Sequence, residues 1–288
     1  MDEIRVKARA KINLSLDIMG KRDDGYHEIS TIMQSVELFD SLHIKKVYKP
    51  NYLKLVTNIS WLATDEKNLV YLAAAYLKKE FNIKTGIFIN LKKNIPASAG
   101  LGGGSADCAA AMAGIRNLFK LPLTDDDLIE IAGKFGADVP FCIKGGLAHA
   151  TGIGEKLEPL PKLPMMHIVL IKPLVIVSTE EVFKGFRLDK VTHRPNTEGM
   201  LKSIQNGDWE GICNSMGNVL ESVTANQYPI IKELKEVLLG QGAMAAMMTG
   251  SGPTVFGVFA RRSSAENAVN VLRKNYPDFN EIYLTKSI

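Results

Sequence analysis

The sequence predicts an α+β fold with two domains, on the basis of its length, the grouping of its expected elements and one glycine- and proline-rich segment. At roughly 150 residues per domain, 288 residues make about two domains. The expected strands and helices are grouped rather than regularly alternating, which favours α+β over a parallel sheet with crossover helices. Residues 144–164 contain four glycines and three prolines. We therefore place the domain boundary near residue 160, giving domains 1–160 and 161–288.

The first domain is expected to begin with a long strand. Between Ile4 and Ile18, apolar residues occupy the even positions and polar residues occupy the odd positions. A period of two over this length predicts a half-buried strand. After a turn at residues 20–25, further extended structure is expected at residues 32–47 and 86–91.

Caps and composition mark the helices of the first domain. Polar residues at positions 64 and 65 are candidate caps for a helix over residues 64–79, which repeats apolar residues at helical spacing. An alanine-rich run predicts a second helix over residues 105–119. Thr124 and Asp127 resemble a capping box with aspartate in place of glutamate, and the helix that they open is expected to end near Gly136.

The second domain combines short strands with several helices. Strands are expected at residues 166–171, 254–260 and 281–285. Helices are expected near residues 197–206, 209–222, 229–239 and 263–275. The last of these helices has a capping-box pattern from Ser263 to Glu266.

Composition and charge exclude several classes of protein. Hydrophobic residues make up 46% and charged residues 23% of the chain, which argues against a disordered chain or a coiled coil. A net charge of +4 is too small for this length to indicate nucleic-acid or membrane binding. The three cysteines are far apart and indicate neither a disulfide framework nor a zinc site. Without a recognisable targeting segment or membrane span, the chain is expected in the cytoplasm, and its oligomeric state is left open.

The strongest functional feature is a glycine-rich loop between an expected strand and an expected helix. Its residues are Pro96, Ala97, Ser98, Ala99, Gly100, Leu101, Gly102, Gly103, Gly104 and Ser105. Glycines allow a close approach of the backbone to an anion, and a helix N-terminus attracts negative charge. This pattern predicts a phosphate-binding loop, with a flexible loop and a capping serine as the alternative. The spacing fits neither a Walker A loop nor GxGxxG, which disfavours a dinucleotide-dependent oxidoreductase.

Other polar residues have weaker signals when each is considered alone. Lys11 and Asn13 share the polar face of the first strand, which is usually a solvated face. Asp138 follows a helix stop, where an aspartate is usually a cap or turn residue. His27 near a turn is more often a surface or packing residue than a base, and residues 249–254 fit a tight hairpin.

Taken together, these segments resemble the GHMP kinase superfamily, whose members carry a Pro-x-x-x-Gly-Leu-Gly loop. The matching segments are Ala10-Lys11-Ile12-Asn13-Leu14, Asp24-Gly25-Tyr26-His27, the loop at 100–105, Gly136-Ala137-Asp138-Val139-Pro140 and Gly250-Ser251-Gly252-Pro253-Thr254. The resemblance implies an N-terminal domain like the second domain of ribosomal protein S5 and a C-terminal ferredoxin-like domain, with the active site in the cleft between them. It also implies transfer of the ATP γ-phosphate to the 2-hydroxyl of a CDP-linked methylerythritol, a step of non-mevalonate isoprenoid synthesis.

The resemblance assigns catalytic and ATP-binding roles to individual residues. Asp138 would act as the general base, with Lys11 keeping it ionised and stabilising the transferring phosphoryl group. The amides of residues 102–104 would hold the triphosphate, and Ser105 would contact a phosphate or the Mg²⁺ that accompanies ATP. Asn68, early in its helix, would face the adenine.

The resemblance also assigns residues to the second substrate. Tyr26 would stack on the cytosine, His27 would bond to its polar edge, and Phe183 would supply a second aromatic ring. Asn13 would lie near the methylerythritol hydroxyls. The Tyr26-His27 element argues against the alternative acceptors mevalonate, homoserine and sugars, while Lys11 and Asp138 argue against a nucleotide-binding module that has lost catalysis.

The sequence departs from the family pattern in two places. Many relatives have two serines after the glycines, whereas Ser105 is followed here by Ala106 and then Asp107. Asp107 is either a helix N-terminal acid or a neighbour of the metal. Met33 stands where relatives often have an aromatic residue, and its sulfur would pack on the base.

Overall fold

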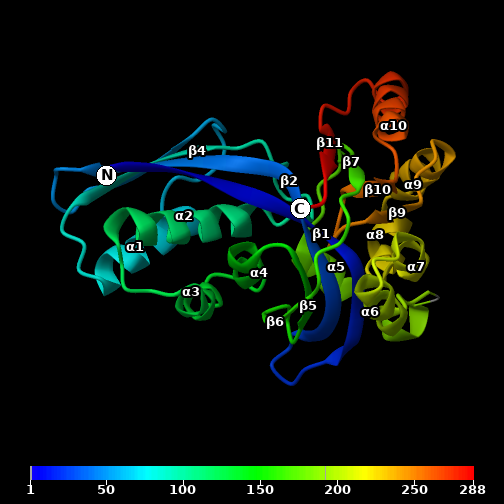
Figure 1. Ribbon diagram of the computed structural model, residues 1–288, viewed down its shortest axis with the longest axis horizontal. Coiled ribbons are helices and arrows are strands. Elements are labelled where there is room, and N and C mark those ends of the chain that lie inside the picture. The colour runs from blue at the N-terminus through cyan, green and yellow to red at the C-terminus, as the bar shows by residue number, and fades with distance from the viewer. Residues whose placement is uncertain (1, 192) are drawn as a thin grey trace. The chain divides into compact units, whose positions relative to one another are not determined.

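The computed structural model describes residues 2–191 and 193–288, and the chain divides into two compact units. Unit 1 consists of the described residues of Met1–Ala10 with Phe39–Ala97 and Gly102–Gly145. Unit 2 consists of Lys11–Leu38, Ser98–Leu101 and the described residues of Gly146–Ile288. Two long strands, β1 (Glu3–Lys21) and β2 (His27–Val47), contribute residues to both units (Figure 1).

Unit 1 packs helices on a sheet. The second half of β2 pairs antiparallel with β4 (Gly86–Lys92), and β4 pairs parallel with β3 (Leu53–Thr57). Helices α1 (Leu69–Glu80) and α2 (Gly103–Phe119) lie side by side (Figure 1). Period-two strands and an alanine-rich helix therefore form where their patterns predict them.

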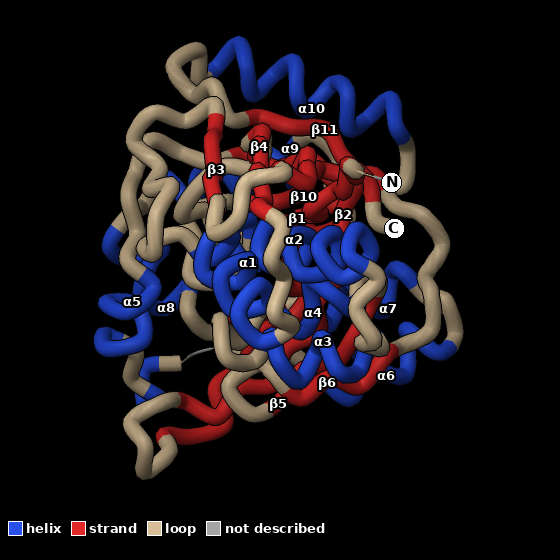
Figure 2. Tube along the Cα trace, turned by 90° about the vertical axis from the view of Figure 1, so that its left-hand side faces the viewer, coloured by secondary structure: helices blue, strands red, loops and turns tan. Residues whose placement is uncertain are grey.

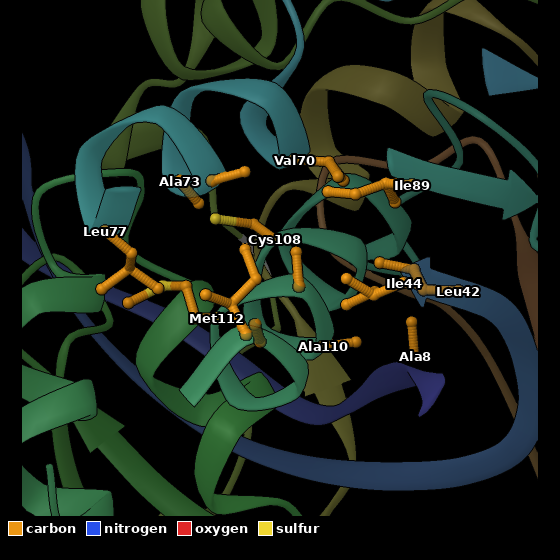
Figure 3. Packing of buried hydrophobic residues seen from close by; sticks show 14 of the residues in the cluster. Ala8, Leu42, Ile44, Val70, Ala73, Leu77, Ile89, Cys108, Ala110 and Met112 are labelled. Atoms are coloured by element: carbon orange, nitrogen blue, oxygen red, sulfur yellow. The ribbon is translucent and has the colours of Figure 1, made fainter. Parts of the chain in front are cut away.

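The apolar faces of these elements form the core of unit 1. Figure 3 shows side chains from β1, β2, β4, α1 and α2 that point toward one another, including Ala8, Leu42, Ile44, Ile89, Val70, Ala73, Leu77, Cys108, Ala110 and Met112. Burial of a leucine or isoleucine of this kind contributes roughly 1.5–3 kcal/mol. The small residues of α2 allow it to approach α1 closely, so the helix that follows the glycine-rich loop is firmly seated in unit 1.

Two short helices complete unit 1, α3 (Asp125–Ala132) and α4 (Val139–Lys144). The capping box is confirmed, because the hydroxyl of Thr124 accepts from Asp127 N and the Asp127 carboxylate accepts from Thr124 N. The predicted end near Gly136 is wrong, since α3 ends at Ala132 and α4 follows without having been predicted.

The predicted caps at positions 64 and 65 are also wrong. The N-cap of α1 is Asn68, whose side-chain oxygen accepts from Val70 N at 2.9 Å. An N-cap is set by which side chain reaches the first free amides, and Asn68 reaches them directly.

The main sheet of unit 2 has the strand order β11-β7-β10-β9, all antiparallel. The strands are β7 (His167–Ile171), β9 (Ala245–Met248), β10 (Val255–Phe259) and β11 (Ile282–Lys286). Helices α9 (Ile230–Gly240) and α10 (Arg262–Asn275) pack against this sheet, and Figure 2 shows α10 beside β11. The expected hairpin at residues 249–254 is confirmed, because this segment joins β9 to β10.

The remaining elements of unit 2 are short. They are β5 (Leu147–Thr151), β6 (Lys156–Pro159), α5 (Thr179–Gly185), η1 (Leu188–Lys190), α6 (Thr197–Gln205), α7 (Trp209–Ser215), β8 (Gly217–Asn218) and α8 (Glu221–Gln227). The single helix predicted over residues 209–222 is wrong. Asn218 interrupts it by donating to Met248 O and Gly250 O while β8 pairs parallel with β1.

The capping box predicted for the last helix is wrong as well. Helix α10 begins at Arg262, and Arg261 occupies its N-cap position, so Ser263 and Glu266 already lie inside the helix. Glu266 instead accepts from the Arg262 side chain one turn earlier, at 2.8 Å. In the described part of the chain, no helix is long and apolar enough to cross a bilayer. The domain limits at residue 160 stay a prediction.

Candidate active site

A buried polar junction in unit 2 brings together three segments that are far apart in the sequence. Its centre is Asn13 on β1, whose side-chain oxygen accepts from Lys11 Nζ at 2.9 Å and from Thr249 Oγ1 at 3.2 Å. The Asn13 amide nitrogen donates to Thr31 Oγ1 at 2.8 Å, and its backbone N–H donates to Thr249 Oγ1 at 3.1 Å. Lys11 and Asn13 are only 4% and 2% exposed, so the solvated-face interpretation of this strand is wrong here.

The glycine-rich loop joins the same junction. The single hydroxyl proton of Thr249 is shared between Asn13 Oδ1 and Gly100 O, each 3.2 Å from Oγ1, and Lys11 N donates to Leu101 O at 3.0 Å. Gly100 has a φ of +74°, and a Cβ on it would lie 2.1 Å from Thr249 O. Both the left-handed backbone and the close approach require glycine at this position. The first strand, the loop and the β9–β10 hairpin therefore meet. The sequence did not single out Thr31, and it predicted Thr249 only as part of the hairpin at residues 249–254.

The loop leads into α2 with an open helix start. The N-cap is Gly102, with a φ of 66° and no side chain to offer the helix, and the first turn consists of Gly103, Gly104 and Ser105 without an acidic residue. Gly104 is exposed, and a Cβ on it would meet nothing within 4 Å among the described residues. The first amides of this 17-residue helix are thus available to an external anion.

The first part of the loop contains both buried and exposed residues. Pro96 and Ala99 are buried, Ala97 is half-buried, and Ser98 is exposed with a positive φ of 50°. Ser105 is half-buried in the first turn of α2. The loop is therefore anchored by its apolar members, while its polar and glycine members reach the surface.

Asp138 occupies the N-cap position of α4 and is half-buried. Within the described residues, its carboxylate does not cap the amides of that helix, and Pro140 already occupies the first turn, where it removes one amide donor. Asp138 therefore lies in the turn before α4, as one of the two ordinary interpretations predicts, but its side chain does not cap that helix.

An aromatic group of unit 2 contains two of the residues assigned to the second substrate. The His27 ring lies 5.5 Å from the Phe183 ring and 6.1 Å from the edge-on Phe186 ring. Burial, together with the charge of Lys21, lowers the pKa of His27, so the neutral imidazole is favoured. Tyr26 next to it is 61% exposed. Phe186 was not predicted, although its spacing of three residues from Phe183 on a helical segment is a signal that could have found it.

Two other assigned residues, Asn68 and Met33, make contacts within the fold that differ from their assigned roles. Asn68 caps α1 with its oxygen and donates to Ala63 O at 2.7 Å with its amide. Met33 is fully buried on β2, so its sulfur has no exposed surface on which a base could pack. The Asn68 side chain thus supports the backbone around it.

Comparisons with known proteins identify the family of the chain. Residues 68–146 match the GHMP kinases N terminal domain, and residues 200–278 match the GHMP kinases C terminal domain. The chain belongs to the GHMP kinase family, and its predicted fold class is confirmed. Proteins named 4-diphosphocytidyl-2-C-methyl-D-erythritol kinase from Caldicellulosiruptor saccharolyticus and Enterococcus faecalis are 47% and 44% identical, covering 93% and 99% of this chain and 92% and 99% of theirs. Within the family, the chain falls in the group of 4-diphosphocytidyl-2-C-methyl-D-erythritol kinases.

Solved structures give the same result. A crystal structure of a 4-(cytidine 5'-diphospho)-2C-methyl-D-erythritol kinase superposes with a TM-score of 0.82 at 30% identity, covering 99% of each chain. The homoserine kinase of Cytophaga hutchinsonii superposes with a TM-score of 0.80 at 23% identity, covering 100% of this chain and 95% of its own. The second match supports the fold alone, since its sequence is more distant.

Proposed function

We propose that the chain transfers the γ-phosphoryl group of ATP to the 2-hydroxyl of 4-diphosphocytidyl-2-C-methyl-D-erythritol, a step of non-mevalonate isoprenoid synthesis, with Asp138 and Lys11 as its catalytic residues. The kinase activity follows from the relatives that share nearly the whole chain. The observation that carries the site assignment is the junction of Lys11, Asn13, Thr249 and Gly100, which joins the phosphate-binding loop to the first strand.

In the proposed reaction, Asp138 accepts the proton of the substrate hydroxyl, and the oxygen of that hydroxyl forms a bond to the γ-phosphorus. The bond from the γ-phosphorus to the bridging oxygen breaks, and ADP leaves. Lys11, fixed by its hydrogen bond to Asn13, stabilises the charge that spreads over the transferring phosphoryl group. General base catalysis contributes roughly 10²–10⁴-fold, and positioning with charge stabilisation supplies the rest.

For ATP, we assign phosphate binding to the amides of Gly102, Gly103 and Gly104, with the rest of the loop from Pro96 to Ser105 shaping the site. The open start of α2 supports this assignment. Asn68 is proposed to face the adenine from its position at the start of α1, although both polar groups of its side chain also make local hydrogen bonds.

We further propose that Mg²⁺ accompanies ATP. Among residues 2–191 and 193–288, no group of three or more histidine, cysteine or acidic side chains could hold a metal ion. The Ser105 hydroxyl in the first turn of α2 fits a cation that is carried largely by phosphate oxygens and water. When bound, the ion would neutralise phosphate charge. ATP as a substrate also supports a cytoplasmic location.

The acceptor site is proposed around the aromatic group of unit 2. Neutral His27 would bond to the polar edge of cytosine, and exposed Tyr26 would stack on its face. Phe183 would supply the second ring, since it already contacts His27. Asn13 would face the methylerythritol hydroxyls, and its fixed orientation in the junction would set their position.

The test of the base is Asp138→Asn. The turnover number is expected to fall by roughly 100-fold or more, the low end of what a general base contributes, with ADP affinity by calorimetry nearly unchanged. Asp126→Asn, which changes an exposed aspartate in the first turn of α3, is the matched control and should keep wild-type turnover. A near wild-type rate for Asp138→Asn would overturn the base assignment.

The test of the acceptor compares three alcohols in an ATP-consumption assay: 4-diphosphocytidyl-2-C-methyl-D-erythritol, homoserine and mevalonate. Turnover is expected with the first alone, and CDP should compete with it. Turnover with homoserine or mevalonate, or no inhibition by CDP, would contradict the acceptor assignment.

A further inference from the structure

Unit 1 contains a buried ion cluster that the proposed reaction does not use, made of Asp40, Lys93 and Asp107. The side chains are 0%, 7% and 4% exposed, respectively. Lys93 Nζ donates to Asp107 Oδ2 at 2.7 Å and also to Asp40 Oδ2. The three residues come from β2, from the residue after β4 and from α2.

The cluster holds the chain just before the glycine-rich loop. Asp40 Oδ1 accepts from the backbone N–H groups of Asn94 and Ile95, at 2.5 and 2.7 Å. The Asn94 side chain donates to Phe39 O at 3.0 Å. Two successive amides and one side chain therefore fix residues 93–95 to β2, directly before Pro96.

The same cluster holds the chain just after the loop. Asp107 is the fifth residue of α2, and its carboxylate accepts from Lys93. A Cβ on Gly103, the first residue of α2, would lie 3.2 Å from Lys93 Nζ and 3.1 Å from Ile95 Cγ2. The ammonium group thus lies against the first turn of α2. Lys93 therefore holds both ends of segment 96–102, because it lies just before this segment and its side chain donates to Asp107 in α2.

Stability alone is a poor explanation for such a cluster. Taking charged groups out of water is costly, and apolar residues of similar volume often give equal or greater stability. Asp107 Oδ1 has no hydrogen-bond partner among the described residues, and burial raises the pKa of this carboxyl group to about 8. A buried cluster with an unpaired oxygen adds little to the unfolding free energy, but it restricts the segments that it joins to one geometry.

We propose that the Asp40–Lys93–Asp107 cluster is a positioning device that fixes both ends of the glycine-rich loop and so determines nucleotide affinity without contacting the nucleotide. This inference rests on the proposed function in assigning phosphate binding to the loop. The loop contains four glycines, which give an unanchored chain many conformations to lose on binding. Fixing its ends in advance reduces that entropy cost.

Lys93 acts here as a positioning residue and not as a phosphate ligand. Its side chain is only 7% exposed, and its ammonium group already donates to two carboxylates. A lysine that binds phosphate as a point charge would instead present its ammonium to the ligand.

The first experiment compares Lys93→Met with Lys78→Met by calorimetry of ADP binding. Lys78 is a matched control in unit 1, because its ammonium donates to Ile83 O and Thr85 O at 2.7 and 2.6 Å, away from the loop. Lys93→Met should weaken ADP binding by roughly tenfold, the size of a lost charge-assisted hydrogen bond, while Lys78→Met changes it less than about twofold. Equal ADP affinity in both variants would overturn the proposal.

A second pair keeps the proposal testable if Lys93→Met does not fold. Asp107→Asn keeps an acceptor oxygen for Lys93, whereas Asp107→Leu removes it while keeping the number and branching of the side-chain heavy atoms. Asp107→Asn should retain ADP affinity within about threefold, and Asp107→Leu should lose roughly tenfold and speed amide hydrogen exchange in residues 96–106 of the nucleotide-free protein. Identical exchange and affinity in the two variants would contradict the positioning role. Failure of the wild-type chain to bind ADP would instead count against the proposed function.

Discussion

The N-termini of α2 and α3 lie in the same unit, but side chains cap the first backbone amides of α3 and not those of α2. Helix α3 is closed by Thr124 and Asp127, which bond to each other's backbone N–H groups, and its first turn contains three aspartates. Helix α2 begins at glycines, with Gly102 as N-cap and no acidic residue in its first turn. The two helix starts therefore differ in both hydrogen bonding and charge.

The start of α3 thus stabilises the fold, whereas the start of α2 leaves its amides available to a ligand. A capping side chain is worth about 1 kcal/mol, and acidic residues in the first turn add a favourable interaction with the helix dipole. Helix α2 lacks both contributions. Its amides and dipole remain available for phosphate, and the buried cluster of Asp40, Lys93 and Asp107 holds the helix in place from inside unit 1.

The largest expected effect that would sharpen the comparison comes from Gly100→Ala. Its Cβ would lie 2.1 Å from Thr249 O at a left-handed φ, so the variant should lose roughly 2–4 kcal/mol of unfolding free energy and most of its ADP binding. Gly133→Ala, at the end of α3, is the control, because that residue has a helical φ of −55° and ordinary contact distances. Urea unfolding measures both variants. Similar losses at the two positions would show that the loop before α2 has no special packing.

A smaller effect is expected when the start of α2 is made to resemble that of α3. Gly104→Asp has room for its side chain, but it places a carboxylate where the triphosphate is proposed to bind. Repulsion of about 2 kcal/mol should weaken ADP binding by roughly thirtyfold, while thermal stability is maintained or increased. Gly104→Ala separates charge from bulk and should weaken binding much less. Unchanged ADP affinity in Gly104→Asp would place the phosphates elsewhere.

The smallest effect is expected when the N-terminal cap of α3 is removed. Thr124→Ala removes the cap hydroxyl and should reduce the unfolding free energy by about 1 kcal/mol, as measured by urea unfolding. The kcat and the KM for ATP should stay within about twofold of wild type, because this helix start has no proposed ligand. A large rise in the KM for ATP would mean that the closed helix start also takes part in nucleotide binding.

Local patterns in the sequence account for most of the elements. Alternation over residues 4–18, the alanine run after the loop and the Thr124 capping box each produced the element that it predicted. Predictions failed where a distant contact overrode the pattern. Asn218 divides the predicted helix over residues 209–222 because its amide bonds to carbonyls 30 and 32 residues away.

The candidate site was predictable in its parts but not in its assembly. The sequence identified Lys11, Asn13 and the glycine-rich loop as separate segments. It did not identify Thr249 as the hydroxyl that connects them, since Thr249 is 236 residues from Asn13. Phe186 was missed for a related reason, because its contact with His27 depends on where α5 packs.

The sequence by itself determined the class of fold, the position of the glycine-rich loop before α2 and the family, because periodicity, glycine content and motif order can be taken from the chain alone. Only the tertiary structure decided that Asn13 is buried in a junction and that Lys93 joins two aspartates beneath α2. Such pairings depend on strand register and helix packing, which bring together side chains that no local pattern links. Because these polar groups are buried, the loss of a partner would cost folding free energy.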